Sequence, residues 1–540
     1  FFSSRRRHTR SLCDWSSDVC SSDLDTKSLS PHPDPVATGS SIGVSGWETA
    51  FGVSSPALPT ARRSRPLDLY RIVRDAMLIL MLFLVNKAGF AGAIAFFAVM
   101  VIMAMKSPRA AFQALALIGL ALMINTFFVP KTIPWTVGRL ALPLLILVRF
   151  ANDASRLRIS PFTQPHYVAF LLYVGIMAVC SIASGWYTNI ALLKLFFFWS
   201  FITTVMLGVA VLRERKSDLT EWFVSLVVAA TLIGFLAIAV GQSRNMMFAG
   251  RRIDLFNGVF LHANCHSLYG SVFTTFLATL AVIGAYRNRW VTVPLIGCWL
   301  TFMTLSGARS SLLATVIGLF ALFVLTNQRL RRFGARLQVN VPRTTQLACV
   351  VVAMLGALAY NFYAGGAVWK SVVEFVNKRE MDESEEVVDF ETADMVGSRQ
   401  ALIEYSWKNF LENPVFGIGF GVAKTAHFVE TATYFTAAAE KGVLATAVLE
   451  EGGVLGATAF VCFVVALFLA LRREKNVPAI VTLITFLGSN LGEATFISAG
   501  GMGGFGWVMV GAAMILGDHC WQPQSPPRST YAMARRSFAA

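Results

Sequence analysis

Residues 190–212, IALLKLFFFWSFITTVMLGVAVL, form an apolar run with a single charged side chain, Lys194. A helix needs about 20 apolar residues to cross the hydrocarbon layer of a bilayer. Only helices and closed barrels satisfy their backbone hydrogen bonds in lipid. This run therefore predicts a transmembrane helix.

Similar runs recur along the chain and give fourteen candidate helices. They fall at roughly 69–85, 88–105, 109–128, 137–151, 166–184, 190–212, 221–241, 262–286, 290–306, 309–326, 346–363, 451–471, 478–497 and 502–517. Three of them are short, so we expect twelve to fourteen spans. The sequence predicts an all-α, polytopic integral membrane protein, with helices 1–11 in residues 67–363 and helices 12–14 in residues 451–517.

The composition agrees with a membrane protein, because 55% of the residues are hydrophobic and only 14% are charged. The formal net charge is +15, but the basic residues lie in short clusters between apolar runs. This pattern is typical of cytoplasmic membrane loops and argues against a nucleic-acid partner. The eight cysteines form no CxxC pair, which excludes the usual zinc and disulfide frameworks.

Lys and Arg clusters in alternate loops predict the orientation of the chain. They occur near residues 106–109, 156–158, 213–216, 287–289, 329–343 and 472–475. This side is expected to be cytoplasmic, as are a disordered tail at 25–66 and a C-terminal tail at 518–540. Residues 1–24 resemble a translated sequencing adapter, and we interpret them as an artefact.

The longest polar stretch, residues 364–450, is predicted to be a large periplasmic loop. It holds 14 acidic and 7 basic residues. Residues 398–411 have the pattern of an amphipathic helix with Ser398 as its N-cap, and this helix could lie on the membrane. Its predicted apolar face consists of Ile403, Trp407, Phe410 and Leu411. The GIGFG sequence at 417–421 is interpreted as a tight turn, since no strand precedes it.

Four arginines break the charge rule, because Arg244, Arg251, Arg252 and Arg309 fall on the external side. A guanidinium group stays charged and offers a planar fork of donors to phosphate oxygens. Arg251, Arg252 and Arg309 are therefore candidates for binding a lipid diphosphate at the membrane surface.

A hydroxyl acceptor would need a general base. His427 and Glu440 are the candidates, and Glu450 and Glu451 are alternatives. His262 and His266 have a spacing that suits metal, but no third ligand is evident. We predict no metal and no cofactor.

Four motifs of this chain resemble the O-antigen ligase and polymerase family. They are RRIDLFNGVFLHAN at 251–264, LSGARS at 305–310, GSR at 397–399 followed by Trp407, Asn413-Pro414 and Gly417-Ile418-Gly419, and LEEGGVLG at 449–456. Each motif is weak alone, but together they cover about residues 240–460 in the family's order.

The resemblance implies a metal-independent, inverting glycosyltransferase on the periplasmic side of a bacterial inner membrane. Its donor would be a glycan on undecaprenyl diphosphate, and its acceptor either another glycan or lipid A core. Arg251 or Arg252, together with Arg309, would match the family's diphosphate-binding arginines. Arg399 would match a third motif arginine.

The chain departs from the ligase pattern at the expected base. A His-Asn pair should precede the final motif, but Gly442 and Val443 stand there. Either His427 or Glu440 substitutes, or the chain is a divergent polymerase for a capsule or exopolysaccharide. The alternative is a polytopic transporter or flippase of a polysaccharide or lipid-linked precursor. Glu493, inside an apolar segment, is the feature that favours the transporter.

Overall fold

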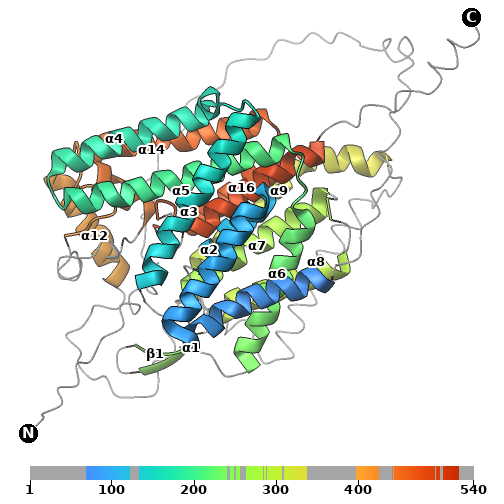
Figure 1. Cartoon of the computed structure of the whole chain (residues 1–540). Helices are drawn as coiled ribbons and strands as arrows, with labels where there is room; N and C mark the ends of the chain where they lie inside the picture. Colours follow the sequence, from blue (N-terminus) through green and yellow to red (C-terminus); the bar gives the residue numbers. More distant parts are fainter. Residues whose placement is uncertain are drawn as a thin grey trace, which may run out of the picture.

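The chain folds as a bundle of helices (Figure 1), seen in a computed structural model. The structure describes residues 69–121, 133–239, 244–248, 251–255, 263–283, 285–286, 289–306, 309–336, 397–424, 441, 443–492, 494–498 and 503–521. Within these ranges there are thirteen α-helices, so the all-α, polytopic prediction is confirmed.

The helices follow the predicted apolar runs closely. They are α1 (Leu69–Lys106), α2 (Pro108–Ala121), α3 (Ile133–Arg156), α4 (Pro165–Ser184), α5 (Thr188–Glu214), α6 (Thr220–Ala239), α7 (Ala263–Ile283), α8 (Arg289–Leu305), α9 (Arg309–Arg336), α12 (Gly397–Glu412), α14 (Leu444–Arg473), α15 (Val477–Ser489) and α16 (Gly503–Trp521), with a short 3₁₀ turn at Pro161–Thr163. Four of the described segments are both long and apolar enough to cross a membrane: Gly89–Lys106, α4, α5 and α14.

Several details differ from the sequence predictions. The first two predicted spans form the single element α1, which breaks at Gly89 with φ of 55°. Between α6 and α7 the chain forms a β-hairpin, in which β1 (Arg244–Phe248) pairs antiparallel with β2 (Arg251–Leu255). Ser398 is the second residue of α12, so its predicted N-cap position is wrong. The predicted span at 346–363 and both predicted segments before residue 67 lie outside the described residues.

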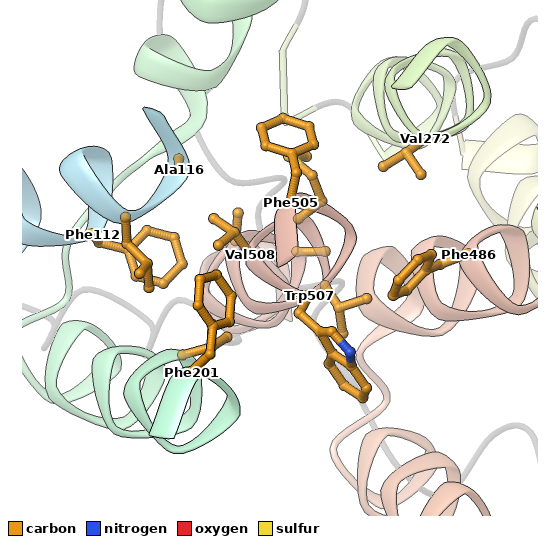
Figure 2. Packing of buried hydrophobic residues seen from close by; sticks show 14 of the residues in the cluster. Phe112, Ala116, Phe201, Val272, Phe486, Phe505, Trp507 and Val508 are labelled. Atoms are coloured by element: carbon orange, nitrogen blue, oxygen red, sulfur yellow. The ribbon is translucent and has the colours of Figure 1, made fainter. Parts of the chain in front are cut away.

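The core of the bundle is α16, which four other helices surround. Every residue from Gly503 to Gly517 is buried, as expected for a helix that is apolar on all sides. Phe505, Trp507 and Val508 of α16 point outward between their neighbours (Figure 2). Those neighbours are Phe112 and Ala116 of α2, Phe201 of α5, Val272 of α7 and Phe486 of α15.

Charged contacts gather at one end of the bundle, which we call the basic end. The C-terminal ends of α1, α3, α5 and α14 meet there. Three contacts join them: Arg149 Nη1 to the Met105 carbonyl oxygen at 2.9 Å, Arg215 Nη2 to Asp153 Oδ1 at 3.1 Å, and Arg213 Nη2 to Glu474 Oε2 at 2.7 Å. Four of the basic clusters predicted to share one side of the membrane therefore lie at one end of the molecule.

Candidate functional site

The opposite end of the bundle, which we call the loop end, lies where α4 ends and α5 and α14 begin. In Figure 1, α12 lies beside this end of α14. The segment Pro414–Ala423, here called the glycine loop, follows α12 and returns to the membrane helices. It contacts α4, α5 and α14 through hydrogen bonds. The glycine loop is therefore part of the membrane bundle rather than a surface turn.

A break in α14 explains this position. Gly453 has a φ of 58° and a ψ of −158°, which is not helical. The helical pattern would bond the N–H groups of Val454 and Leu455 to the carbonyls four residues earlier. Instead, Val454 donates to the Pro414 carbonyl at 2.8 Å, and Leu455 donates to the Val415 carbonyl at 3.3 Å.

The two carbonyl groups released by the break also find partners in the glycine loop. The Ile418 N–H donates to the Glu450 carbonyl at 2.8 Å, and the Gly419 N–H donates to the Glu451 carbonyl at 3.0 Å. The loop therefore replaces two donors and two acceptors of the helix. This exchange matters because each unsatisfied backbone group in an apolar environment costs several kcal/mol.

The hydrogen bonds between the glycine loop and α14 require glycine where the two backbones approach most closely. Gly417, Gly419 and Gly421 have φ of 66°, 106° and 64°, in the left-handed region that side chains disfavour. A Cβ at Gly417 would lie 2.5 Å from the Glu450 carbonyl oxygen. The interpretation of this GIGFG sequence as an isolated tight turn was therefore incomplete, because its glycines serve contact with α14.

The Glu450 carboxylate joins α14 to two other segments. Its Oε1 accepts from Asn409 Nδ2 at 2.8 Å, and its Oε2 accepts from Ser406 Oγ at 2.8 Å. Lys441 Nζ lies 2.7 Å from the same Oε2 and donates to the Val422 carbonyl at 2.7 Å. Both charged side chains are almost fully buried, at 4% and 1% exposure. These contacts engage both oxygens, so the geometry favours an anchoring role for Glu450 over the alternative role of base.

Glu451, the next residue of α14, is 2% exposed. The Gly421 N–H bonds its carboxylate, and Lys194 and Lys441 act on it electrostatically. Lys194 Nζ donates to the Gly421 carbonyl at 2.6 Å. Oε2 of Glu451 is buried without a hydrogen-bond partner. Two buried glutamates, the buried Lys441 and the half-buried Lys194 thus surround the glycine loop.

The pKa values of two side chains on α12, Tyr405 and Glu412, are shifted by their surroundings. Burial, together with the charges of Glu450 and Glu412, raises the pKa of Tyr405 above its ordinary value. The hydrogen bond from Lys424 lowers the pKa of Glu412. At neutral pH Tyr405 is therefore a neutral phenol and Glu412 is ionised.

The predicted site residues lie on separate elements of the chain. Arg251 and Arg252 lie in β2, opposite Phe248 and Met247 of β1. Arg309 is the first residue of α9, and Arg399 lies in the first turn of α12. His427 and Glu440, the proposed bases, lie outside the described residues, as do His262 and Glu493.

The sequence analysis missed the partners of Glu450. Ser406 and Asn409 lie on a polar face of α12 beside its predicted apolar face, and only the structure shows that this polar face is buried. Lys441 was given no role in the predictions from the sequence. An available signal was the pair Glu450-Glu451 beside an apolar run, since carboxylates buried in a membrane helix require partners.

No cluster of three or more His, Cys, Asp or Glu side chains able to hold a metal ion occurs in the described part of the chain. His266 of the candidate histidine pair is 1% exposed in α7, and its ring lies 5.2 Å from that of Trp299 and 5.6 Å from that of Phe302. The surroundings of His266 are therefore those of a core aromatic side chain.

Part of the chain matches a known protein family. Residues 291–461 match the O-antigen ligase family. The matched segment runs from α8 into α14 and includes α9, α12, the glycine loop and Glu450. The resemblance to the O-antigen ligase and polymerase family is thereby confirmed. No curated protein matches the chain.

The glycine loop gives a first prediction. Gly417→Ala should lower the thermal stability of the detergent-solubilised protein, since left-handed backbone costs a residue with a side chain about 1–2 kcal/mol and the new Cβ would collide with the Glu450 carbonyl. The control is Gly297→Ala in α8, where a Cβ meets nothing within 4 Å. The measurement is the temperature at which the monodisperse size-exclusion peak is lost. Equal midpoints for the two variants would contradict the close approach.

The Lys441–Glu450 pair gives a second prediction. Lys441→Met should destabilise the fold strongly, because breaking a buried pair leaves an uncompensated charge at a cost of about 3–5 kcal/mol. The double variant Lys441→Met/Glu450→Gln should recover much of the loss.

The control for this pair is Lys424→Met. Lys424 lies at the same distance, 2.7 Å, from Glu412, but these side chains are 24% and 46% exposed. Exposed pairs contribute little, so this variant should melt like the unmodified protein. Equal losses of thermal stability in Lys424→Met and Lys441→Met would contradict a stabilising role for the buried Lys441–Glu450 pair. So would a double variant that is no more stable than Lys441→Met alone.

Proposed function

We propose that this protein is a membrane glycosyltransferase that transfers or polymerises a glycan carried on undecaprenyl diphosphate. The match of residues 291–461 to the O-antigen ligase family supports a membrane enzyme of polysaccharide assembly. The lipid-linked donor, the glycan or lipid A core acceptor and the lack of a metal requirement are parts of the proposal. The missing His-Asn pair favours a polymerase over a lipid A core ligase.

The contacts of one side chain, Glu450, are the structural observation that supports this function. The Glu450 side chain holds α12, whose first turn contains Arg399, and also holds Lys441, which directly follows Glu440. The helix that contains a proposed phosphate ligand and the residue that follows a proposed base thus contact the same carboxylate. Catalysis requires such positioning, because well-oriented groups avoid a large entropic cost at the moment of reaction.

The proposed chemistry assigns a role to each candidate residue. An acceptor hydroxyl oxygen attacks the anomeric carbon, the bond from that carbon to the diphosphate breaks, and His427 or Glu440 takes the hydroxyl proton. The lipid diphosphate leaves with the bonding electrons. Its negative charge would be stabilised by guanidinium groups, which come from Arg251, Arg252, Arg309 and Arg399.

The proposed orientation places the basic end in the cytoplasm, since Lys and Arg clusters favour that side. The loop end would then face the periplasm of a bacterial inner membrane. All four arginines lie in segments predicted to face outward, so they would meet a diphosphate headgroup in the outer leaflet.

The arginines give a third prediction. Arg252→Ala, Arg309→Ala and Arg399→Ala should each lower glycan transfer by about 10²-fold or more, because each removes a donor to the leaving group. The assay incubates the purified protein, in detergent with EDTA, with an undecaprenyl-diphosphate oligosaccharide, and a gel resolves the products. Lys408→Ala, which removes an exposed cation from the same helix as Arg399, is the matched control.

The products separate the candidate functions. A ladder of longer lipid-linked glycans indicates a polymerase, whereas transfer only after addition of lipid A core indicates a ligase. Activity at the unmodified level in all three arginine variants would contradict the assigned roles. An unchanged donor in the presence of every acceptor, with movement of that donor across proteoliposomes, would favour the flippase alternative.

A further inference from the structure

Helix α12 has three distinct faces. Its polar face, with Ser406 and Asn409, is buried against Glu450. At 100° per residue, a second face carries Glu404, Lys408 and Glu412, and a third carries Ile403, Trp407, Phe410 and Leu411. The third face is uncovered in part, since Trp407 is 47% exposed and Leu411 is 60% exposed, whereas Ile403 and Phe410 are half-buried.

The uncovered apolar face of α12 continues into the glycine loop. Val415 and Phe416 are 49% and 39% exposed. We call Trp407, Leu411, Val415 and Phe416 the α12 apolar surface. Exposed apolar groups gathered in one contiguous area indicate a binding surface for another apolar phase or molecule.

The depth of this surface is fixed by its attachment to α14. The Leu455 N–H donates to the Val415 carbonyl at 3.3 Å, so these two residues lie at the same level. Val454 and Leu455 are themselves 52% and 45% exposed, and they belong to a helix long and apolar enough to span a membrane. The α12 apolar surface is thus continuous with a surface of α14 that would face lipid.

We infer that the α12 apolar surface inserts into the outer part of the bilayer, so that α12 lies along the membrane with its charged face toward water. A helix of this kind buries its apolar side at the boundary between headgroups and acyl chains. Trp407 has the amphipathic ring that favours this level, and Lys408 can extend its ammonium group to the headgroups.

The charge distribution supports lipid over a protein partner for this surface. The Lys424 hydrogen bond lowers the pKa of Glu412 and keeps it ionised on the charged face. If only the apolar face of α12 enters the bilayer, lipid covers Leu411 while Glu412 and Lys408 stay in water. The inference stands on exposure and on the attachment to α14, so it is independent of the proposed glycan transfer.

Nitroxide labels provide the test. In a full-length variant whose eight native cysteines are replaced by serine or alanine, Leu411→Cys and Lys408→Cys are labelled separately and reconstituted in lipid nanodiscs. Collision with apolar oxygen is compared with collision with a water-soluble nickel chelate. The label at 411 should give a several-fold higher ratio of oxygen to nickel accessibility than the label at 408.

Two results would overturn the inference. Equal nickel accessibility at both positions would place the surface in water, and low accessibility to both reagents at 411 would mean that protein, including a second copy of the chain, covers it.

A second measurement needs no cysteine replacement. Phospholipids with bromine on the acyl chains near the headgroup quench tryptophan fluorescence on contact. Reconstituted Trp407→Phe protein should lose part of the quenching seen in the unmodified protein, which has twelve tryptophans. Quenching that is unchanged by Trp407→Phe would also overturn the inference.

Discussion

The loop end of this protein depends on the backbone polar groups that are released where α14 breaks at Gly453. In an apolar environment these groups need partners within the protein. The glycine loop provides them, with two N–H donors for the carbonyls of Glu450 and Glu451 and two carbonyls for the amides of Val454 and Leu455. This exchange outweighs the nearby ion pair in energetic terms, because a buried pair roughly balances its own desolvation cost, whereas each unsatisfied backbone group costs several kcal/mol.

The side chains around the loop add specificity to this backbone closure. Glu450 selects one placement of α12 through Ser406 and Asn409, and Lys441 ties the segment that enters α14 to the same carboxylate. The described part of residues 364–450 is thereby attached to the membrane helices through α12, the glycine loop and Lys441. If α12 also rests on lipid, its first turn is held near the level of headgroup phosphate. A rigid frame of this kind suits an enzyme that aligns a lipid-bound donor with a separate acceptor.

The fold was largely predictable from the sequence, whereas the arrangement of the site was not. Length and apolarity alone located α4, α5 and the body of α14, because a spanning helix must be apolar over about 20 residues. The apolar face of α12 was also predicted correctly, since its 3.6-residue period is a local property. The role of the GIGFG sequence was missed because it depends on carbonyls of α14 that are distant in the chain. The partners of Glu450 were missed for the same reason, since Ser406 and Asn409 have no local pattern that distinguishes a buried polar face from a solvated one.

The most direct test of the exchange between the glycine loop and α14 is hydrogen–deuterium exchange of the unmodified protein in lipid nanodiscs, followed by mass spectrometry of peptides covering 414–423 and 450–456. Because Ile418, Gly419, Val454 and Leu455 donate backbone hydrogen bonds within the protein, their amides should exchange slowly, at rates close to those in the middle of α14. Exchange of residues 414–423 as rapid as that of an exposed loop would contradict the account.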